Sequence, residues 1–189
     1  MGFHEAMHGF VSHWLGDTTA KDAGSLTLNP LKHIDIYTTV LLPLGLILLH
    51  IPPFFIAKPV PFNPYRVRWG EYGVALIGIA GPLTNLVIAI IASFFVRVSN
   101  ISVASNLYTV ITIFIEINVI FFIINMIPIP PLDGSRLLYA FAPEPLKNVM
   151  RQIESMGIIA IIIFMLILVN IGGGFIYTIE NGLLNLLLG

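Results

Sequence analysis

The chain of 189 residues contains no cysteine and few charged residues. Without cysteine it cannot form disulfides or use a thiolate, so a bound metal must be held by His, Asp or Glu. Only 10% of the residues are charged, against about 25% in soluble domains, while 57% are hydrophobic and the mean hydropathy is +0.92. The net charge is -1 and no basic run is present, so no nucleic-acid partner is expected. We therefore predict an all-α, multi-pass membrane protein with one domain over residues 1–189 and the lipid bilayer as its surroundings.

An H-E-x-x-H motif, His4-Glu5-Ala6-Met7-His8, lies at the start of the chain. On an α-helix the two histidines lie on one face, one turn apart, so both imidazoles can bind one tetrahedral zinc ion. Zinc lowers the pKa of its bound water from about 15.7 to about 7, and the neighbouring carboxylate can accept the proton and pass it to a leaving amine. The motif predicts a hydrolase with Glu5 as general base. A catalytic zinc usually has a third protein ligand, which the rest of the chain must supply.

Apolar segments divide the remaining sequence. A helix carrying the motif is expected over residues 2–15, and a proline-rich, extended, basic loop over residues 58–66. About 20 apolar residues are needed to cross the roughly 30 Å hydrocarbon layer. We predict about four membrane-spanning helices, of which the first is truncated at its N-terminus, and one re-entrant segment. The first helix covers residues 2–15, the others residues 72–96, 107–127 and 157–177, and the re-entrant segment residues 37–57.

The basic residues indicate how residues 37–57 meet the membrane. If this segment crosses the bilayer, the nine Lys and Arg residues divide three to six between the two sides. If it bends at Pro52-Pro53 and returns, only Arg97 lies opposite the other eight. The positive-inside rule favours the stronger asymmetry, so we predict a re-entrant segment and place the eight charges in the cytoplasm. The end of the first helix and the end of span 107–127 then lie on the same side, where two halves of one metal site could meet.

Asp133 is the candidate third ligand. Pro128, Pro130 and Pro131 cannot continue a helix, so the chain after span 107–127 is expected to be extended and to bring Asp133 near the cytoplasmic face. Taken alone, Asp133 could equally be the N-cap of a helix that starts at Ser135. Beside an intramembrane H-E-x-x-H motif the ligand interpretation is stronger, because ionisable residues buried in a membrane are costly and usually functional.

Six ordered motifs occur between the start of the chain and about residue 142. They are His4 to His8, the turn from Gly16 to Ala20, and the stretches Leu26 to Asp35, Ala57 to Pro61, Ala80 to Asn85 and Asn125 to Gly134. Together they resemble the site-2 protease family of intramembrane zinc metalloproteases, in its compact prokaryotic branch without PDZ or CBS domains. The resemblance implies a zinc metalloendopeptidase of a prokaryotic cell membrane that cleaves membrane-protein substrates in or near the bilayer. It implies one zinc ion bound by His4, His8 and Asp133, with Glu5 as general base and the zinc site between the first helix and the end of the third span.

A substrate helix must unwind before water can attack its peptide bonds. An extended segment over residues 128–132 would offer unpaired backbone groups to such an unwound strand, so we predict that Pro128 and Pro130 contact substrate. The resemblance implies that Asn125 helps to hold the same strand. Asn85 suits close helix packing with an amide hydrogen bond, and it could also reach the active-site cavity. His33 is expected to order its loop more than to act in catalysis.

Only Met1-Gly2-Phe3 precede the motif, whereas members of the family carry an apolar run there. Residues 2–15 make about 21 Å of helix, short of a full span, so the sequence starts downstream of a natural start or the first helix is a half-span. Two other classes of function stay open. One is a protease-like membrane scaffold without catalysis, and the other is a transporter in which broken helices and Glu116 form an ion path.

Overall fold

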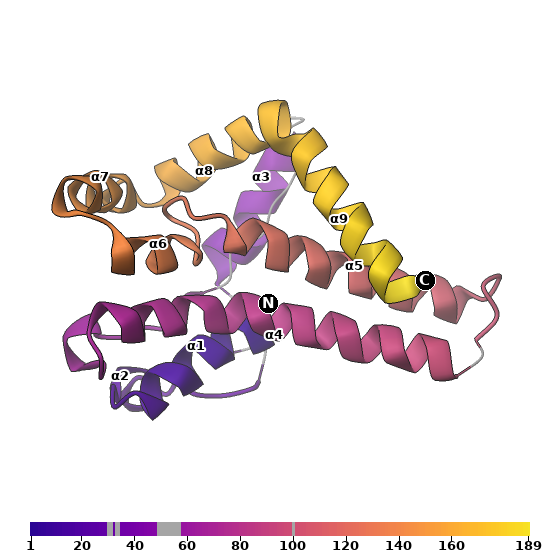
Figure 1. The fold of residues 1–189 in the computed structure, drawn as a ribbon, viewed down its shortest axis with the longest axis horizontal. Helices are drawn as coiled ribbons and strands as arrows, with labels where there is room; N and C mark the ends of the chain where they lie inside the picture. Colours follow the sequence, from indigo (N-terminus) through magenta and orange to yellow (C-terminus); the bar gives the residue numbers. More distant parts are fainter. Residues whose placement is uncertain (30–31, 33–34, 49–57, 100) are drawn as a thin grey trace. The chain divides into compact units, whose positions relative to one another are not determined.

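The computed structural model describes residues 1–29, 32, 35–48, 58–99 and 101–189, in two compact units that cover residues 1–81 and 82–189. Within these described ranges the regular elements are helical and none is a β-strand, which confirms the predicted all-α class (Figure 1). Helices α4 (Glu71–Val98) and α5 (Asn106–Met126) are long and apolar enough to cross a membrane. Helices α7 (Glu144–Ser155) and α8 (Ile158–Ile167), bent by 102°, would form a third span if the pair crosses together. The lengths and compositions of these helices fit an integral membrane protein.

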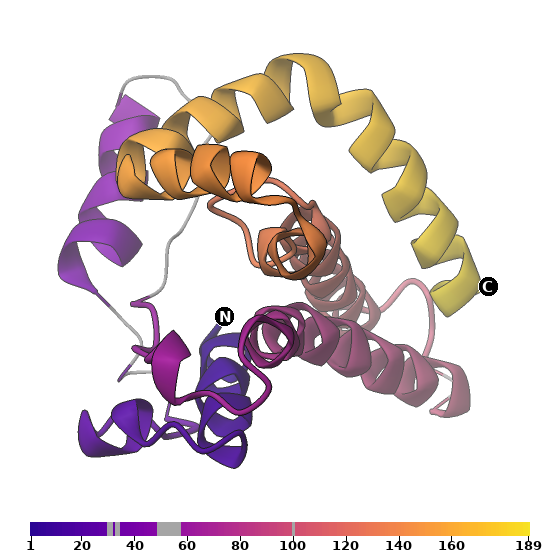
Figure 2. The ribbon, with the colours of Figure 1, turned by 60° about the vertical axis from the view of Figure 1, so that its left-hand side comes forward.

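The first unit is built around helix α1 (Gly2–Trp14), which carries the H-E-x-x-H motif and confirms the helix expected over residues 2–15. In this unit α1 lies beside the first part of α4 (Figures 1 and 2). A buried apolar cluster of this unit consists of Leu15, which follows α1, Val67, which precedes α4, and Ile77 of α4. Val11 and Phe62 pack against it. The other elements of the unit are α2 (Thr19–Asp22), the π-helical turn η2 (Ile36–Leu41), α3 (Leu42–Leu48) and the 3-10 turn η3 (Pro64–Arg66).

The predicted re-entrant segment is described over its first part only. Residues 37–48 form η2 and α3, and Asp35 caps the start of η2 by accepting hydrogen bonds from the N–H groups of Tyr37 and Thr38. The predicted bend at Pro52-Pro53 lies outside the described residues. The re-entrant topology therefore stays a prediction.

Asp17 joins three parts of the first unit. Its side chain is fully buried, and Oδ2 accepts hydrogen bonds from the Ser12 hydroxyl at 3.0 Å and the Asn63 N–H at 2.6 Å. Oδ1 accepts from the Thr19 N–H at 3.1 Å and the Thr19 hydroxyl at 2.5 Å. Burial raises the pKa of Asp17, but these hydrogen bonds to the ionised carboxylate outweigh it and hold the pKa below its ordinary value. The end of α1, the start of α2 and the segment before η3 thus share one buried carboxylate.

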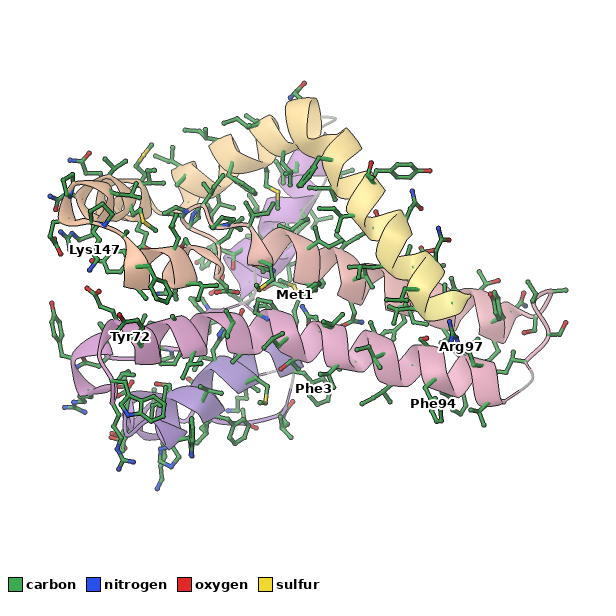
Figure 3. All side chains as sticks on the ribbon, viewed as in Figure 1. Met1, Phe3, Tyr72, Phe94, Arg97 and Lys147 are labelled. Atoms are coloured by element: carbon green, nitrogen blue, oxygen red, sulfur yellow. The ribbon has the colours of Figure 1, made fainter. Side chains whose placement is uncertain are left out.

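The second unit contains the rest of α4 with α5, α6 (Ser135–Phe141), α7, α8, the π-helical turn η4 (Leu168–Gly172) and α9 (Gly173–Leu188). Its apolar cluster joins Ala89 and Val96 of α4 to Ile115, Val119 and Ile123 of α5, and residues of α9 pack against the same cluster. Arg97 donates a hydrogen bond of 2.9 Å to the Leu186 carbonyl, and the Ser93 hydroxyl bonds to the Leu187 carbonyl. Figure 3 shows Arg97 beside the end of α9. The end of α9 is thereby attached to the end of α4.

The span predicted over residues 157–177 is not one straight helix. It consists of α8, η4 and the start of α9, and Figures 1 and 2 show the chain bending between α8 and α9. Gly172, Gly173 and Gly174 lie at this junction, where the absence of side chains weakens a regular helix. Helices α6 and α7 lie between the spans predicted over residues 107–127 and 157–177. The prediction of a single domain and the total of four spans stay predictions.

Replacing Asp17 with asparagine is expected to make the free energy of unfolding depend less on pH in the acid range. The pKa of Asp17 in the folded chain lies below its ordinary value of 3.8, so its contribution is complete above that pH and is lost as the pH falls through the folded-state pKa. In detergent, Asp17→Asn should lower the unfolding free energy at neutral pH by about 1–3 kcal/mol, because a buried network loses its charged acceptor. The loss relative to the wild type should shrink as the pH falls below 3.8.

Asp22→Asn is the matched control, because Asp22 is an exposed residue that bonds to the Thr18 hydroxyl at 2.8 Å. Its unfolding free energy should stay within about 0.5 kcal/mol of the wild type. An equal loss of stability at pH 7 and at acid pH for Asp17→Asn would contradict the assignment of a depressed pKa.

Candidate metal centre

Helix α1 presents both motif histidines on one face. Their ring centroids lie 4.8 Å apart with the ring planes at 83°, and both side chains are buried. One ring nitrogen of His4 lies within 4.8 Å of one ring nitrogen of His8. This is a separation that a single metal ion can bridge, since zinc binds imidazole nitrogen at about 2.0–2.1 Å from each ring. The geometry expected from the four-residue spacing is confirmed for this pair.

A backbone carbonyl of α4 orients His8. The Nδ1 atom of His8 lies 2.7 Å from the Ile77 carbonyl oxygen. Because a carbonyl can only accept, Nδ1 carries the proton and donates it, which leaves the lone pair of the neutral ring on Nε2. Histidines that bind metal usually donate their other ring N–H to such an acceptor. The bond therefore sets the tautomer and direction that a zinc ligand needs.

Gly81 lets α4 approach both imidazoles closely. A Cβ atom at this position would lie 2.4 Å from Nε2 of His8 and 2.7 Å from Nε2 of His4. The Nε2 atoms of the two histidines thus lie near the same point on α4, and no larger side chain fits there. The structure identifies the two ring nitrogens as the atoms against which Gly81 packs.

Glu5 lies next to a backbone donor of the proline-rich loop. Its Oε2 atom accepts a hydrogen bond of 3.3 Å from the N–H of Val60. Val60 stands between Pro59 and Pro61, which have no backbone N–H, so it supplies the sole main-chain donor of this tripeptide. The sequence predicted the extended loop but did not connect it with the H-E-x-x-H motif. The isolated N–H between two prolines was the signal available.

The second unit contains Asp133, which is half-buried in a loop between α5 and α6. The Gly134 N–H donates to the Asn125 carbonyl at 2.6 Å, so residues 126–133 form a closed loop at the end of α5. A Cβ atom at Gly134 would lie 2.5 Å from the Met126 carbonyl oxygen, so this closure depends on glycine. Gly134, rather than Asp133, occupies the N-cap position of α6.

The prediction of an extended segment over residues 128–132 is wrong. The N–H of Ile129 donates to the Ile127 carbonyl at 2.9 Å, and the N–H of Leu132 donates to the Ile129 carbonyl at 3.0 Å. The segment consists of bends and turns. Prolines leave few N–H groups here, and those that remain bond within the loop, so the segment does not offer a continuous edge for an added strand.

The other predicted site residues lie in different surroundings. Asn125 donates its side-chain amide to the Phe121 carbonyl at 3.0 Å, within its own helix, and its backbone carbonyl closes the loop. Pro128 is exposed and Pro130 is buried. Asn85 is almost fully buried in α4. His33 lies outside the described residues. The substrate-contacting role of Asn125, Pro128 and Pro130 stays a prediction.

The chemistry of these residues fits zinc. Two imidazole nitrogens and a carboxylate oxygen make a donor set that catalytic zinc sites use, and the chain offers no thiolate as an alternative. His4, Glu5 and His8 come together in the first unit, with orientation from the Ile77 carbonyl and the Val60 N–H. The joining of Asp133 to the two histidines is part of the function proposed below.

Comparisons with known proteins agree with this chemistry. A sequence model of peptidase family M50 matches residues 96–169. The chain is 34% identical over 167 residues to "Putative zinc metalloprotease YwhC" of Bacillus subtilis (strain 168), covering 85% of this chain and 73% of that protein. It is 27% identical over 164 residues to "Putative zinc metalloprotease Rip2" of Mycolicibacterium smegmatis (strain ATCC 700084 / mc(2)155), covering 86% of this chain and 62% of that protein. No solved structure matches the chain. By its identity to the first relative and the length over which it extends, the chain belongs to peptidase family M50, the site-2 protease family.

Proposed function

We propose that this protein is an intramembrane zinc metalloendopeptidase, which hydrolyses peptide bonds in or near the transmembrane segments of membrane proteins. The observation that carries the proposal is the approach of the His4 and His8 Nε2 atoms to one point on α4, with Glu5 on the same helix. Membership of family M50 and the apolar helices α4 and α5 support it.

His4, His8 and Asp133 would hold one zinc ion in this proposal. Catalytic zinc sites take three protein ligands and leave the fourth position open, and two histidines with one carboxylate are a known set. Asp133 is the proposed third ligand because the loop 126–133, closed by the Asn125–Gly134 hydrogen bond, presents a carboxylate at the end of a membrane-length helix. When bound, zinc would polarise the scissile carbonyl and acidify a water molecule.

Glu5 performs the proton transfers in this proposal. Its carboxylate accepts a proton from the attacking water and returns it to the leaving amine. The Val60 N–H holds Oε2, so the carboxylate keeps one orientation during both transfers. His8 keeps its ligand nitrogen directed at the centre because its Nδ1–H is bonded to the Ile77 carbonyl.

The substrate would be an unwound stretch of a membrane helix, since intrahelical hydrogen bonds otherwise cover its peptide groups. Asn125, Pro128 and Pro130 are proposed to contact this stretch from the loop that carries Asp133. Eight of the nine basic residues fall on one side under the predicted topology, which supports an active site toward the cytoplasm. The bacterial relatives support placing the protein in the plasma membrane of a prokaryote.

Removal of the general base tests the enzymatic proposal. Glu5→Gln keeps the size and helix of the motif but removes the proton acceptor, so cleavage should fall by about 10²–10⁴-fold while bound zinc is retained. The assay uses the protein in liposomes with a single-span helical peptide that carries a fluorophore and a quencher on either side of its membrane segment.

Each result of this assay separates the candidate functions. Zinc binding without cleavage in wild type and variant alike would favour the inactive scaffold. If the protein binds no zinc and Glu5→Gln does not change cleavage, the protease hypothesis is refuted and the transporter hypothesis remains.

Removal of the proposed third ligand tests the donor set. Purified wild-type protein should bind about one zinc ion per chain, and His4→Ala or Asp133→Ala should remove most of it, because a site with two protein ligands is incomplete. Metal content is measured by atomic emission after dialysis against a weak chelator. If Asp133→Ala binds as much zinc as the wild type, Asp133 is not a ligand and another side chain must complete the site.

Gly81→Ala tests the close approach of α4. The added methyl group would lie 2.4 Å from His8 Nε2 and 2.7 Å from His4 Nε2, so the rings must move. Zinc affinity should fall by about 10–100-fold, as it does when groups that orient metal ligands are disturbed. Gly45→Ala is the matched control, because it is a helical glycine of the same unit with no atom within 4 Å of the added Cβ. Equal affinities for the two variants would show that Gly81 does not constrain the histidines.

A further inference from the structure

Val60 contacts α1 through its backbone N–H and through its side chain. Together the two contacts fix the position of the loop along the helix. The Val60 N–H donates to Glu5 Oε2, and the Val60 side chain, which is 7% exposed, packs over Gly9. A Cβ atom at Gly9 would lie 3.0 Å from Val60 Cγ1, 3.3 Å from Leu26 Cδ1 and 3.5 Å from the Cβ of Ala20. Gly9 lies one turn after Glu5 on the same face of the helix. A shift of the loop along α1 would therefore break the hydrogen bond and the side-chain packing together.

Asp17 holds the same loop three residues further along. The Asn63 N–H donates to Asp17 Oδ2 at 2.6 Å, and Asn63 then caps η3 by accepting from the Tyr65 N–H at 3.0 Å. The carboxylate is itself fixed by Ser12 of α1 and by Thr19 at the start of α2. A buried carboxylate with four donors is costly to disturb, since each lost bond leaves a buried polar group without its partner. Residues 60–63 are thus attached to α1 at two points.

We propose that Asp17 is a positioning residue for Glu5: by fixing residues 60–63 against α1, it keeps the Val60 N–H on the Glu5 carboxylate. This inference rests on the proposed role of Glu5 as general base. A hydrogen bond to Oε2 restricts the rotamer of a flexible side chain, and so restricts where Oε1 can meet the proton of the attacking water. Proton transfer needs heavy atoms within about 2.6–3.2 Å, so an unrestrained glutamate would spend less time in a productive position.

The first test separates the rate of the chemical step from substrate binding. In the zinc-loaded full chain, Asp17→Asn should lower kcat by about tenfold, with KM within about twofold and bound zinc unchanged, because the chemical step alone loses orientation. Asp22→Asn, which alters an exposed carboxylate on α2 bonded to the Thr18 hydroxyl, should keep the wild-type kcat. A wild-type kcat for Asp17→Asn would overturn the inference.

A backbone variant removes the N–H of residue 60 without changing any side chain. Replacing Val60 by its α-hydroxy acid converts the amide into an ester, and kcat should fall about as much as in Asp17→Asn. Combining the two changes should add little, since both act through the same hydrogen bond. An ester variant with full kcat would overturn the inference even if Asp17→Asn proved to be poorly folded.

Hydrogen exchange at the Val60 amide tests the contact independently of catalysis. Exchange in the folded protein should be roughly fivefold faster in Glu5→Ala and in Asp17→Asn than in wild type and Asp22→Asn, the ratio expected for loss of one hydrogen bond. If the wild type cleaves no substrate, the proposed function fails, while exchange at Val60 still shows whether Asp17 maintains the bond to Glu5. Unchanged exchange in Asp17→Asn would overturn the inference whatever the activity.

Discussion

The hydrogen bond between His8 and the Ile77 carbonyl is the interaction on which the candidate site depends most. It ties α1 to α4 inside the first unit, and it decides which nitrogen of His8 can bind a metal. The bond forms because Gly81, one turn further along α4, has no side chain to hold the two helices apart. The buried residues of this helix of thirteen residues are small ones and the two motif histidines, so the bond of His8 to α4 does much to fix its orientation. The short α1 is therefore a firm support for its three motif residues.

The relation between His4 and His8 could be predicted from the sequence, because the argument needed only local geometry. A spacing of four residues on a helix determines that His4 and His8 share a face, and nothing distant can change that relation. The all-α class and the two long apolar helices follow equally from composition and length. These features depend on periodicity within one segment, which a single sequence displays directly.

Contacts between segments far apart in the sequence could not be predicted from such local patterns. Ile77 acts through its carbonyl, which every residue possesses, so no pattern of side chains marks it. The loop before Asp133 was expected to be extended because prolines exclude a helix, but several non-helical conformations, turns among them, remain possible. Ile129 and Leu132 bond to nearby carbonyls because turns satisfy these groups locally, whereas an extended strand would leave them without partners in a mostly apolar chain. The bend between α8 and α9 was missed because glycines permit a regular helix as well as its interruption.

Glycines, which have no Cβ atom, and prolines, which have no backbone N–H, determine several contacts of the first unit. Gly81 has no Cβ, so α4 reaches the imidazoles, and Gly9 has no Cβ, so the Val60 side chain can reach α1. Pro59 and Pro61 have no N–H, so the single donor between them can bond to Glu5 without two further donors that would need partners nearby. A chain with only 10% charged residues has few charged side chains with which to orient the Glu5 carboxylate. Main-chain groups are then the available means of orientation, and glycine and proline control which of them come close enough to act.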